Sequence, residues 1–595
     1  MTDKIAYSAL HYLTLLVFLL SSWGYGHLLM RRLVLASPSA LPAPAASDTP
    51  FLHTYSAILG SGVLICFLQW LAIAGQLRLA AVIDIVAPGV LIGLLQLYAL
   101  RPFAWPSWGQ RWRAASWPLR GAGLIIALLL LPTLIAPLGP PLAWDEVMYH
   151  LPHAEQWVLN GKLTVNTWLR YPWFPYNVDV LFAGGMLVYD DVMPHMFNAL
   201  AGWLATLLLY QTGKRHGGVG LACLATIIFL VLTRWEYDSA MIDLSVTAFM
   251  FAGCVGFLRW TEQPRDAGWL ASAAFLFGIA VGAKYQSLTV LLPLAIALLL
   301  RTRKPRVWLL ASASLLLPCA YWYARNYLMT GDPFAPIGGK LFGFTDWNLA
   351  DYSDQFADLK AQSNWPNVIL WPALLAPFIA SVRQIPGARP AMLLSVYAMV
   401  AWYLTSHYAR YLMPYFPILA LLSAAVWRYL FMTGLEKIGQ RLPAKAGLLR
   451  RAAAPLMLLA VLALAPSIAK RWAENWDLIA PTPVAREAIL EQRITGYSVL
   501  AYLRQHPMRQ TYQFGLEGVL YYAPPGTGGD HFGPGRYRDF VTLAPSALAT
   551  ALRERGNDSM LVNVGRWPDI TAQADFDKSF ALVYQHGPVA VYRIL

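Results

Sequence analysis

An acidic pair, Asp145-Glu146, follows the apolar run Gly121–Leu138 in the segment LGPPLAWDEVMYHLP. Carboxylates are costly to hold beside hydrocarbon, so a pair at the mouth of a membrane helix is expected to line a polar cavity and to work there. Side chains of this type accept and donate protons during catalysis. The pair therefore indicates chemistry at one end of a membrane-embedded site.

Other ionisable residues also stand where apolar segments end. They are Glu236, Asp238 and Asp243 in TRWEYDSAMIDLS, Lys284 in VGAKYQS, Arg325 in YARNYLMTGDPFAP and Arg410 in SHYARYLMPYFP. A lone Lys or Arg at a helix end can simply extend its charge to the membrane surface, and each cation carries this alternative. The recurrence of both signs predicts that carboxylates and cations converge on one side of the membrane.

The residues next to the acidic pair do not indicate a metal or a nucleotide. His150 and His153 are expected to pack or to form hydrogen bonds, because their spacing alone does not make a metal site. No glycine-rich nucleotide loop occurs. The sequence shows no required cofactor and leaves a divalent metal open. The four cysteines are Cys66, Cys223, Cys254 and Cys319. All of them lie in apolar runs without C-x-x-C spacing, so neither disulfides nor a thiolate metal site is expected.

Composition indicates a polytopic α-helical membrane protein. Of the 595 residues, 57% are hydrophobic and only 13% are charged, and the mean hydropathy is +0.46. The formal charge of +13 is spread over short loops and does not form one basic stripe. We therefore interpret this charge as a topology signal and expect no nucleic-acid partner.

Fourteen apolar stretches approach the roughly 20 residues that a membrane span needs. They lie near 10–30, 51–76, 79–100, 121–138, 192–212, 217–233, 240–258, 268–283, 286–300, 307–324, 366–382, 390–405, 411–430 and 452–469. With both termini outside, the inner gaps hold 22 Lys and Arg residues and the outer gaps hold nine. The positive-inside rule selects this orientation and places Asp145-Glu146 on the outer face.

Three regions follow from this pattern. Residues 1–120 hold extra N-terminal helices and the Pro/Ala/Ser linker Ser37–Pro50, and residues 121–470 form a transmembrane core with an outer loop at 139–191. Residues 471–595 are predicted to form a small α/β domain on the outer face. Its expected helices are Ser498–Gln505 and Pro545–Arg555, and its expected strands are Thr511–Phe514, Met560–Val564, Ala581–Tyr584 and Val589–Tyr592, the last two joined by the turn QHGP.

The outer loop between Gly139 and Val180 is rich in aromatic residues, as in WLRYPWFPYN. Amphipathic rings favour the level of the lipid headgroups, so part of this loop is expected to lie in the membrane interface. Such a loop suits a lipid substrate.

Five motifs, in order, resemble the C-type membrane glycosyltransferases, which use polyprenyl-phosphate sugars and include protein O-mannosyltransferases and the lipid A aminoarabinose transferase. The motifs are LAWDEVMYHLPHAEQWVLNGKL, AMIDLSVTAFM, GAKYQSLTVLLPL, YARNYLMTGDPFAP and ARYLMPYFPILALL. The tail segments ENWDLIAP and GLEGVLYYAPP also resemble the outer domain of bacterial members. This chain departs from the family in one respect, because its acidic loop follows the fourth span where many members have it after the first.

The resemblance implies an inverting sugar transfer on the outer, periplasmic face of the inner membrane. The donor would be a polyprenyl-phosphate sugar, and the acceptor a hydroxyl of a saccharide, lipid or protein. Asp145, paired with Glu146, matches the family's catalytic acid and would be the base that takes the acceptor proton. Lys284, Arg325 and Arg410 would hold the departing phosphate. The residues expected to orient the acceptor or tune the base are Tyr149, His150 and Asp243.

Two other functions fit many helices with charges at their ends. One is a transporter or flippase for lipid-linked saccharides, although the chain lacks the matching halves typical of such transporters. The other is a non-catalytic assembly protein whose outer domain does the work. Retained activity after Asp145→Asn would favour either alternative.

Overall fold

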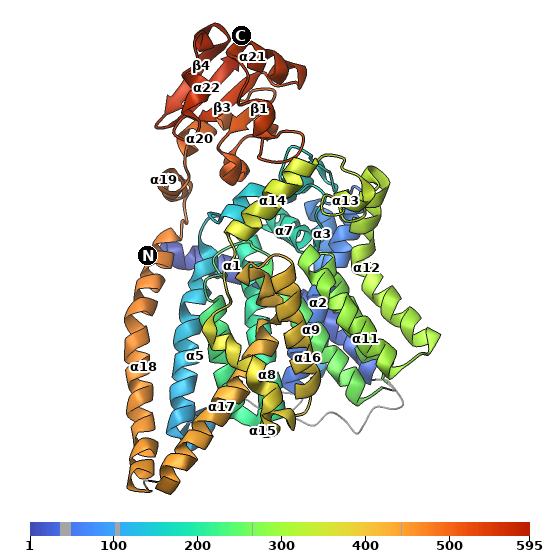
Figure 1. The fold of residues 1–595 in the computed structure, drawn as a ribbon, viewed down its shortest axis with the longest axis vertical. Coiled ribbons are helices and arrows are strands. Elements are labelled where there is room, and N and C mark those ends of the chain that lie inside the picture. The colour runs from blue at the N-terminus through green and yellow to red at the C-terminus, as the bar shows by residue number, and fades with distance from the viewer. Residues whose placement is uncertain (36–48, 101–107, 265, 442) are drawn as a thin grey trace.

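A computed structural model describes residues 1–35, 49–100, 108–264, 266–441 and 443–595, so the linker residues 37–48 lie outside it. The chain forms a bundle of apolar helices with a small α/β domain at one end (Figure 1). The predicted fold class, a helical membrane protein with a C-terminal α/β domain, is confirmed.

Eight described helices are long and apolar enough to cross a membrane. They are or overlap α1 (Thr2–Met30), α2 (Thr49–Ile73), α3 (Leu79–Ala99), α5 (Trp117–Ile135), α8 (Met193–Thr233), α9 (Asp243–Glu262), α12 (Pro305–Thr330) and α17 (Phe416–Arg441). Shorter apolar helical segments are α7 (Asn177–Val188), α10 (Ala267–Val281), η4 (Tyr285–Val290) with α11 (Leu291–Arg301), η5 (Val368–Phe378) and α16 (Ala388–Leu404). The count of fourteen spans stays a prediction.

The remaining elements of the bundle connect these helices. They are η1 (Arg31–Leu35), α4 (Trp108–Ala114), η2 (Ala136–Leu138), η3 (Glu146–His150), α6 (Leu151–Asn160), α13 (Gly339–Phe342), α14 (Leu349–Ala361), α15 (Ala380–Arg383), η6 (Ala409–Tyr415) and α18 (Pro443–Leu478). The last of these helices, α18, packs along α5 and carries the chain to the outer domain (Figure 1).

The helix α8 is a hairpin and not one straight rod. Gly218 has φ 80°, a left-handed conformation that favours glycine. A Cβ added at Gly213 would lie 2.9 Å from the Cα of Ala222, whereas nine residues of straight helix span about 14 Å. The two arms correspond to the stretches 192–212 and 217–233 that the sequence predicts as separate spans.

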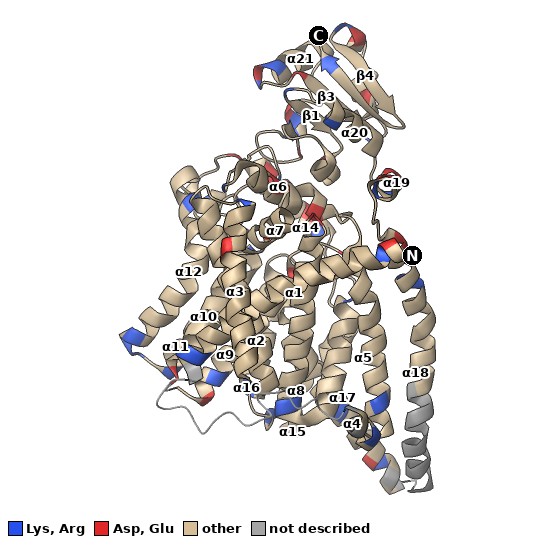
Figure 2. Ribbon diagram, turned by 180° about the vertical axis from the view of Figure 1, so that it is seen from behind, with Lys and Arg blue, Asp and Glu red and all other residues tan. Residues whose placement is uncertain are grey.

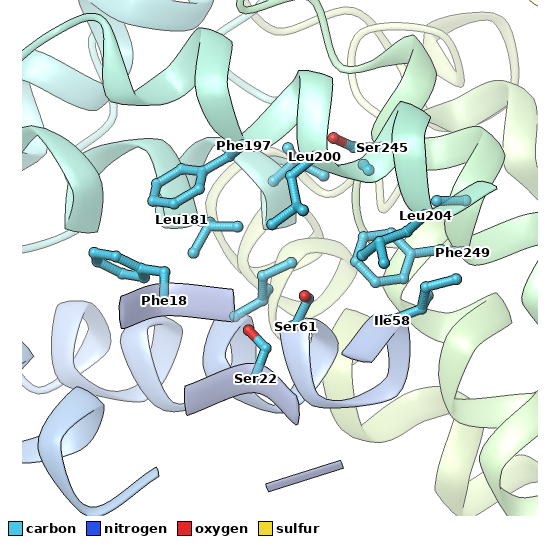
Figure 3. A pocket seen from close by; sticks show the side chains of 14 residues that line it. Phe18, Ser22, Ile58, Ser61, Leu181, Phe197, Leu200, Leu204, Ser245 and Phe249 are labelled. Carbon is cyan, nitrogen blue, oxygen red and sulfur yellow. The ribbon is translucent and has the colours of Figure 1, made fainter. Parts of the chain in front are cut away.

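The three N-terminal helices pack tightly on each other and on the core. A Cβ added at Gly26 would lie 1.8 Å from the Ser56 carbonyl oxygen, so α1 and α2 meet at glycine and serine, as small residues allow in membrane helices. Tyr55 of α2 shares a 3.0 Å hydrogen bond with Ser272 of α10. A cavity of about 30 Å³ remains between α1, α2, α7, α8 and α9 (Figure 3), room for about one water and not for a substrate.

The outer domain, as we call the elements from Pro483 to Ile594, has a five-stranded sheet in the order β2-β1-β3-β5-β4. Strands β2 and β3 run parallel to β1, and β5 runs antiparallel to β3 and β4. The β4–β5 pair is the hairpin predicted from QHGP. Its elements are α19 (Pro483–Arg493), α20 (Tyr497–Gln505), β1 (Thr511–Phe514), η7 (Glu517–Tyr522), β2 (Thr527–Gly528), η8 (Tyr537–Asp539), α21 (Pro545–Glu554), β3 (Ser559–Asn563), α22 (Pro568–Thr571), η9 (Phe576–Lys578), β4 (Phe580–His586) and β5 (Val589–Ile594).

The N-terminus lies at the same end of the bundle as the outer domain. Lys4 Nζ donates a 2.7 Å hydrogen bond to the Trp476 carbonyl near the end of α18. Basic side chains mark the opposite end, around α11, α15 and α17 (Figure 2). This arrangement is the one that the distribution of Lys and Arg predicts for a chain with both termini outside.

Candidate active site

Four of the sequence-predicted residues meet at the end of the bundle that faces the outer domain. Asp145 immediately precedes η3, Asp243 begins α9, Lys284 precedes η4 and Arg410 lies in η6. Each therefore stands where an apolar segment begins or ends. We call Asp145, Arg410, Asp243 and Lys284 the charge cluster.

The charge cluster is a row of alternating charges. Arg410 Nη2 lies 2.5 Å from Asp145 Oδ2, and Arg410 Nε lies 3.7 Å from Asp243 Oδ2. The other oxygen of Asp243 accepts a 2.6 Å hydrogen bond from Lys284 Nζ. Asp243 is buried between the two cations, while side chains of Asp145 and Arg410 remain 22% and 16% exposed. Asp145 and Arg410, at one end of the row, are therefore partly open to a ligand.

An aromatic ring flanks the two cations, and one nitrogen of Arg410 has no hydrogen-bond partner in the described part of the chain. Lys284 Nζ lies 4.6 Å and the Arg410 guanidinium carbon 5.7 Å from the centre of the Tyr411 ring. Arg410 Nε is buried and makes no hydrogen bond within the described residues. Burial opposes the charge on Asp145, but Arg410, together with His150 and Lys284, outweighs this effect and holds the pKa of that carboxyl below its usual value. Asp145 is thus an ionised carboxylate at neutral pH.

Glu146 faces away from the charge cluster and fixes the loop that carries Asp145. Its Oε1 accepts hydrogen bonds from the backbone N–H groups of Leu142 and Ala143, at 2.5 and 2.7 Å, and its Oε2 accepts one from Ala240 at 2.5 Å. His195 Nε2 lies 3.0 Å from the same Oε2. These contacts fit a positioning role and join the Asp145 loop to the segment that precedes Asp243.

Glu146→Gln is expected to lower the free energy of unfolding by about 1–3 kcal/mol, because an amide NH₂ would then face a buried N–H donor. Thermal unfolding of the purified protein measures this loss. Glu155→Gln, at a partly exposed glutamate of α6, is the matched control. Equal losses in both variants would contradict the role given to Glu146.

Tyr149 and His150 are neighbours in the loop that carries Asp145, and they contact different residues. His150 Nδ1 lies 2.6 Å from Asp179 Oδ1, and both side chains are buried. The ring of Tyr149 packs 5.1 Å from that of Tyr171, and burial together with the charge of Asp145 raises the pKa of Tyr149 well above its usual value. Tyr149 is therefore a neutral hydroxyl near Asp145, and the orienting role of both residues stays a prediction.

Arg325 makes its contacts with residues outside the charge cluster. Its guanidinium donates to Asn326 Oδ1 at 2.8 and 3.1 Å and to the Phe174 carbonyl at 3.3 Å, and it lies 4.9 Å from the centre of the Trp322 ring. Asn326 also donates to the hydroxyl of Tyr285, the residue after Lys284. The structure brings Lys284 and Arg410 together on Asp243, whereas a clamp of all three cations stays a prediction.

One acid beside the charge cluster received no role from the sequence. Burial, followed by the charge of Asp243, raises the pKa of Glu236 to about 7. Its position in TRWEYDSAMIDLS places it where an apolar segment ends. Spacing alone does not show which of the three neighbouring acids, Glu236, Asp238 or Asp243, lies close to Lys284 and Arg410. Over the described ranges, no group of three or more His, Cys, Asp or Glu side chains could hold a metal ion.

The outer domain covers the loop that carries Asp145. A Cβ added at Gly518 of η7 would lie 2.4 Å from the Trp144 ring, so only glycine allows this approach. The Tyr522 hydroxyl donates a 2.6 Å hydrogen bond to the Pro141 carbonyl. Arg170 of the aromatic loop pairs with Asp530, its Nε lying 2.7 Å from Oδ2. The outer domain therefore contacts residues on both sides of Asp145 in the chain.

Arg536 and Arg538 of the outer domain reach in addition to α14, where they pair with Asp351 and Asp354. Two aromatic side chains of the loop, Trp173 and Tyr176, are buried against the membrane part: Trp173 Nε1 donates a 2.5 Å hydrogen bond to Asp346, and the Tyr176 ring centre lies 6.1 Å from that of Trp322. These two rings pack inside the protein, and the placement of part of this loop in the lipid interface stays a prediction.

Comparison with known proteins gives two family matches. Residues 182–322 match the family model described as dolichyl-phosphate-mannose-protein mannosyltransferase, and residues 485–593 match a model described as SF2091/S2213. The first match contains Asp243 and Lys284 of the charge cluster. The second covers most of the outer domain.

Two relatives from Shigella flexneri, both described as uncharacterized proteins, align with part of the chain. SF2093/S2215 is 40% identical over 133 residues, which are 21% of this chain and 65% of that protein. SF2092/S2214 is 27% identical over 139 residues, which are 21% of this chain and 74% of that protein. The chain thus spans a little under two thirds of the first relative.

Two solved structures align with most of the chain at low identity. ArnT from Cupriavidus metallidurans, bound to undecaprenyl phosphate, has a TM-score of 0.49 and 14% identity over 79% of this chain and 97% of that one. The Archaeoglobus fulgidus oligosaccharyltransferase, in complex with Zn and sulfate, has a TM-score of 0.43 and 13% identity over 78% of this chain and 73% of that one. The family match over residues 182–322 confirms the predicted resemblance: this chain is similar to the C-type membrane glycosyltransferases.

Proposed function

We propose that this protein is an inverting membrane glycosyltransferase that moves a sugar from a polyprenyl-phosphate donor to an acceptor hydroxyl. The observation that carries the proposal is the charge cluster, in which a partly exposed, ionised carboxylate and two cations meet at the ends of helical segments. Two members of the cluster belong to the segment that matches the mannosyltransferase family. A base and a phosphate site are the two things that this transfer needs.

In the proposed reaction, Asp145 takes the proton of the acceptor hydroxyl while the acceptor oxygen forms a bond to the sugar C1. The bond between C1 and the phosphate oxygen breaks, and its electron pair stays with the polyprenyl phosphate. Lys284 and Arg410 stabilise the negative charge that grows on that phosphate. Glu146 and Asp243 hold the base and the cations in place.

The pairing of Asp145 with Arg410 suggests an order of events. Without donor, Arg410 lowers the pKa of Asp145 and makes it a weak base. A donor phosphate offers Arg410 a second anion, to which guanidinium binds with two parallel hydrogen bonds. As Arg410 turns to the phosphate, the pKa of Asp145 rises and the carboxylate becomes a better base. Donor binding would thus prepare the enzyme for the acceptor.

The test is a transfer assay with membranes that contain the full chain and a panel of labelled polyprenyl-phosphate sugars. We expect one donor to pass its label to an acceptor, and to do so at the face that carries the outer domain, which we place in the periplasm. Vesicles of the two orientations, given an impermeant acceptor, distinguish the faces. Failure of every donor with folded protein would contradict the proposal, and transfer at the opposite face would overturn its topology.

A further inference from the structure

A large apolar groove runs along α11, away from the charge cluster. It has a volume of about 620 Å³, within the range of small-molecule sites, and lies between α8, α9, α10, α11, α16 and α17. One wall follows α11 from Val290 just before it to Arg301 at its end, and the opposite wall includes Leu421 and Ala425 of α17.

The groove is lined by hydrocarbon and closed at one end by positive charge. The charged side chains in its lining are Arg301 and Arg389, both exposed, and the lining contains no Asp or Glu. His216, near the turn of the α8 hairpin, lines the same region. Leu292, Leu300 and Leu393 also line the groove and are 57%, 81% and 75% exposed, so the groove opens sideways, toward the acyl chains of a surrounding bilayer.

We propose that this groove binds one anionic glycerophospholipid from the leaflet opposite the outer domain. Its acyl chains would lie along α11 and α17, and its phosphate would lie between Arg301 and Arg389. An arginine near an anionic headgroup strengthens binding about fivefold, and two of them favour a net negative lipid over a zwitterionic one. The binding of this lipid does not depend on the proposed transferase activity, and only the exclusion of the sugar donor as occupant rests on the proposed function.

The sugar donor does not fit with its phosphate at Arg301. Its phosphate has to lie beside Lys284, but η4 and α11 separate Lys284 from Arg301. Six residues of 3₁₀ helix and eleven of α-helix span roughly 28 Å. A polyprenyl phosphate bound at Arg301 would therefore be out of reach of Asp145.

The experiment compares lipids bound to the purified, delipidated full chain by native mass spectrometry. The probes are phosphatidylglycerol, phosphatidylcholine and a polyprenyl phosphate. We expect phosphatidylglycerol to bind at least about tenfold more tightly than phosphatidylcholine, from the two arginine contributions. The double change Arg301→Ala and Arg389→Ala should remove that preference.

Two further variants distinguish the effect of positive charge from the effect of free volume in the groove. Arg303→Ala with Arg306→Ala removes the same charge at the same end of the bundle from residues outside the groove lining, and should leave the preference unchanged. Ala297→Trp fills the groove and should weaken both phospholipids. Equal binding of the two phospholipids, tighter binding of the polyprenyl phosphate in this groove, or an unchanged preference in the Arg301/Arg389 variant would overturn the proposal.

Discussion

Replacing Asp145 by Asn is expected to lower the rate of sugar transfer by about 10²–10⁴-fold, the usual cost of losing a general base. The amide keeps the shape of the carboxylate but cannot take the acceptor proton. It also releases Arg410 from its 2.5 Å ion pair, so binding of the donor phosphate should persist or strengthen. The expected pattern is thus a fall in kcat without a loss of donor affinity.

Turnover and donor affinity are to be measured separately on purified protein, together with thermal unfolding. Asp354→Asn is the matched control, because Asp354 also pairs with an arginine, Arg538, but at the docking surface of the outer domain. Normal turnover in Asp145→Asn would exclude Asp145 as the base. It would also shift the interpretation toward a transporter or an assembly protein.

Replacing Arg410 by Lys should reduce turnover by about tenfold to a hundredfold, less than the cost of removing a stabilising donor outright. The charge is kept, but an ammonium group cannot place parallel N–H donors on a phosphate or span Asp145 and Asp243 as the guanidinium does. The loss should lie in kcat more than in donor binding, because the leaving phosphate gains charge as the bond breaks.

Arg536→Lys provides the control for this variant. Arg536 also holds a buried carboxylate, that of Asp351, through Nε and Nη2, but at a distance from the charge cluster. The two changes should affect thermal stability alike, and only Arg410→Lys should affect turnover. If both variants lost turnover equally, the bidentate contact at Arg410 would have no special place in the reaction.

The sequence was sufficient for much of the outer domain because its signals are local. The helix expected at Pro545–Arg555 is α21 (Pro545–Glu554), and the strand expected at Thr511–Phe514 is β1 with the same bounds. The turn QHGP joins β4 and β5 as expected. Strand β2 was missed, since two residues, Thr527 and Gly528, carry no alternating pattern and pair only because β1 lies beside them.

The candidate site could be predicted only in part, because its contacts are not local. The helix-end positions of Asp145 and Arg410 are visible in the sequence, but their contact joins residues 265 apart. No local sequence pattern shows that Asp243 contacts both Lys284 and Arg410 while Arg325 forms its hydrogen bonds with Asn326. The aromatic loop shows a similar limit: a ring such as Trp173 suits a lipid interface and a protein interior equally, and its burial here depends on distant partners such as Asp346 and Arg325.

The docking of the outer domain has a consequence for the synthesis and quality control of the protein in the cell. Arg170 and Pro141 lie in a loop made early by the ribosome, and their partners Asp530 and Tyr522 emerge hundreds of residues later. During that interval, the half-built membrane part exposes unpaired charges and aromatic rings. Completion of the outer domain would therefore act as a checkpoint in biogenesis, and chains stalled before it would present recognisable surfaces to proteases and chaperones.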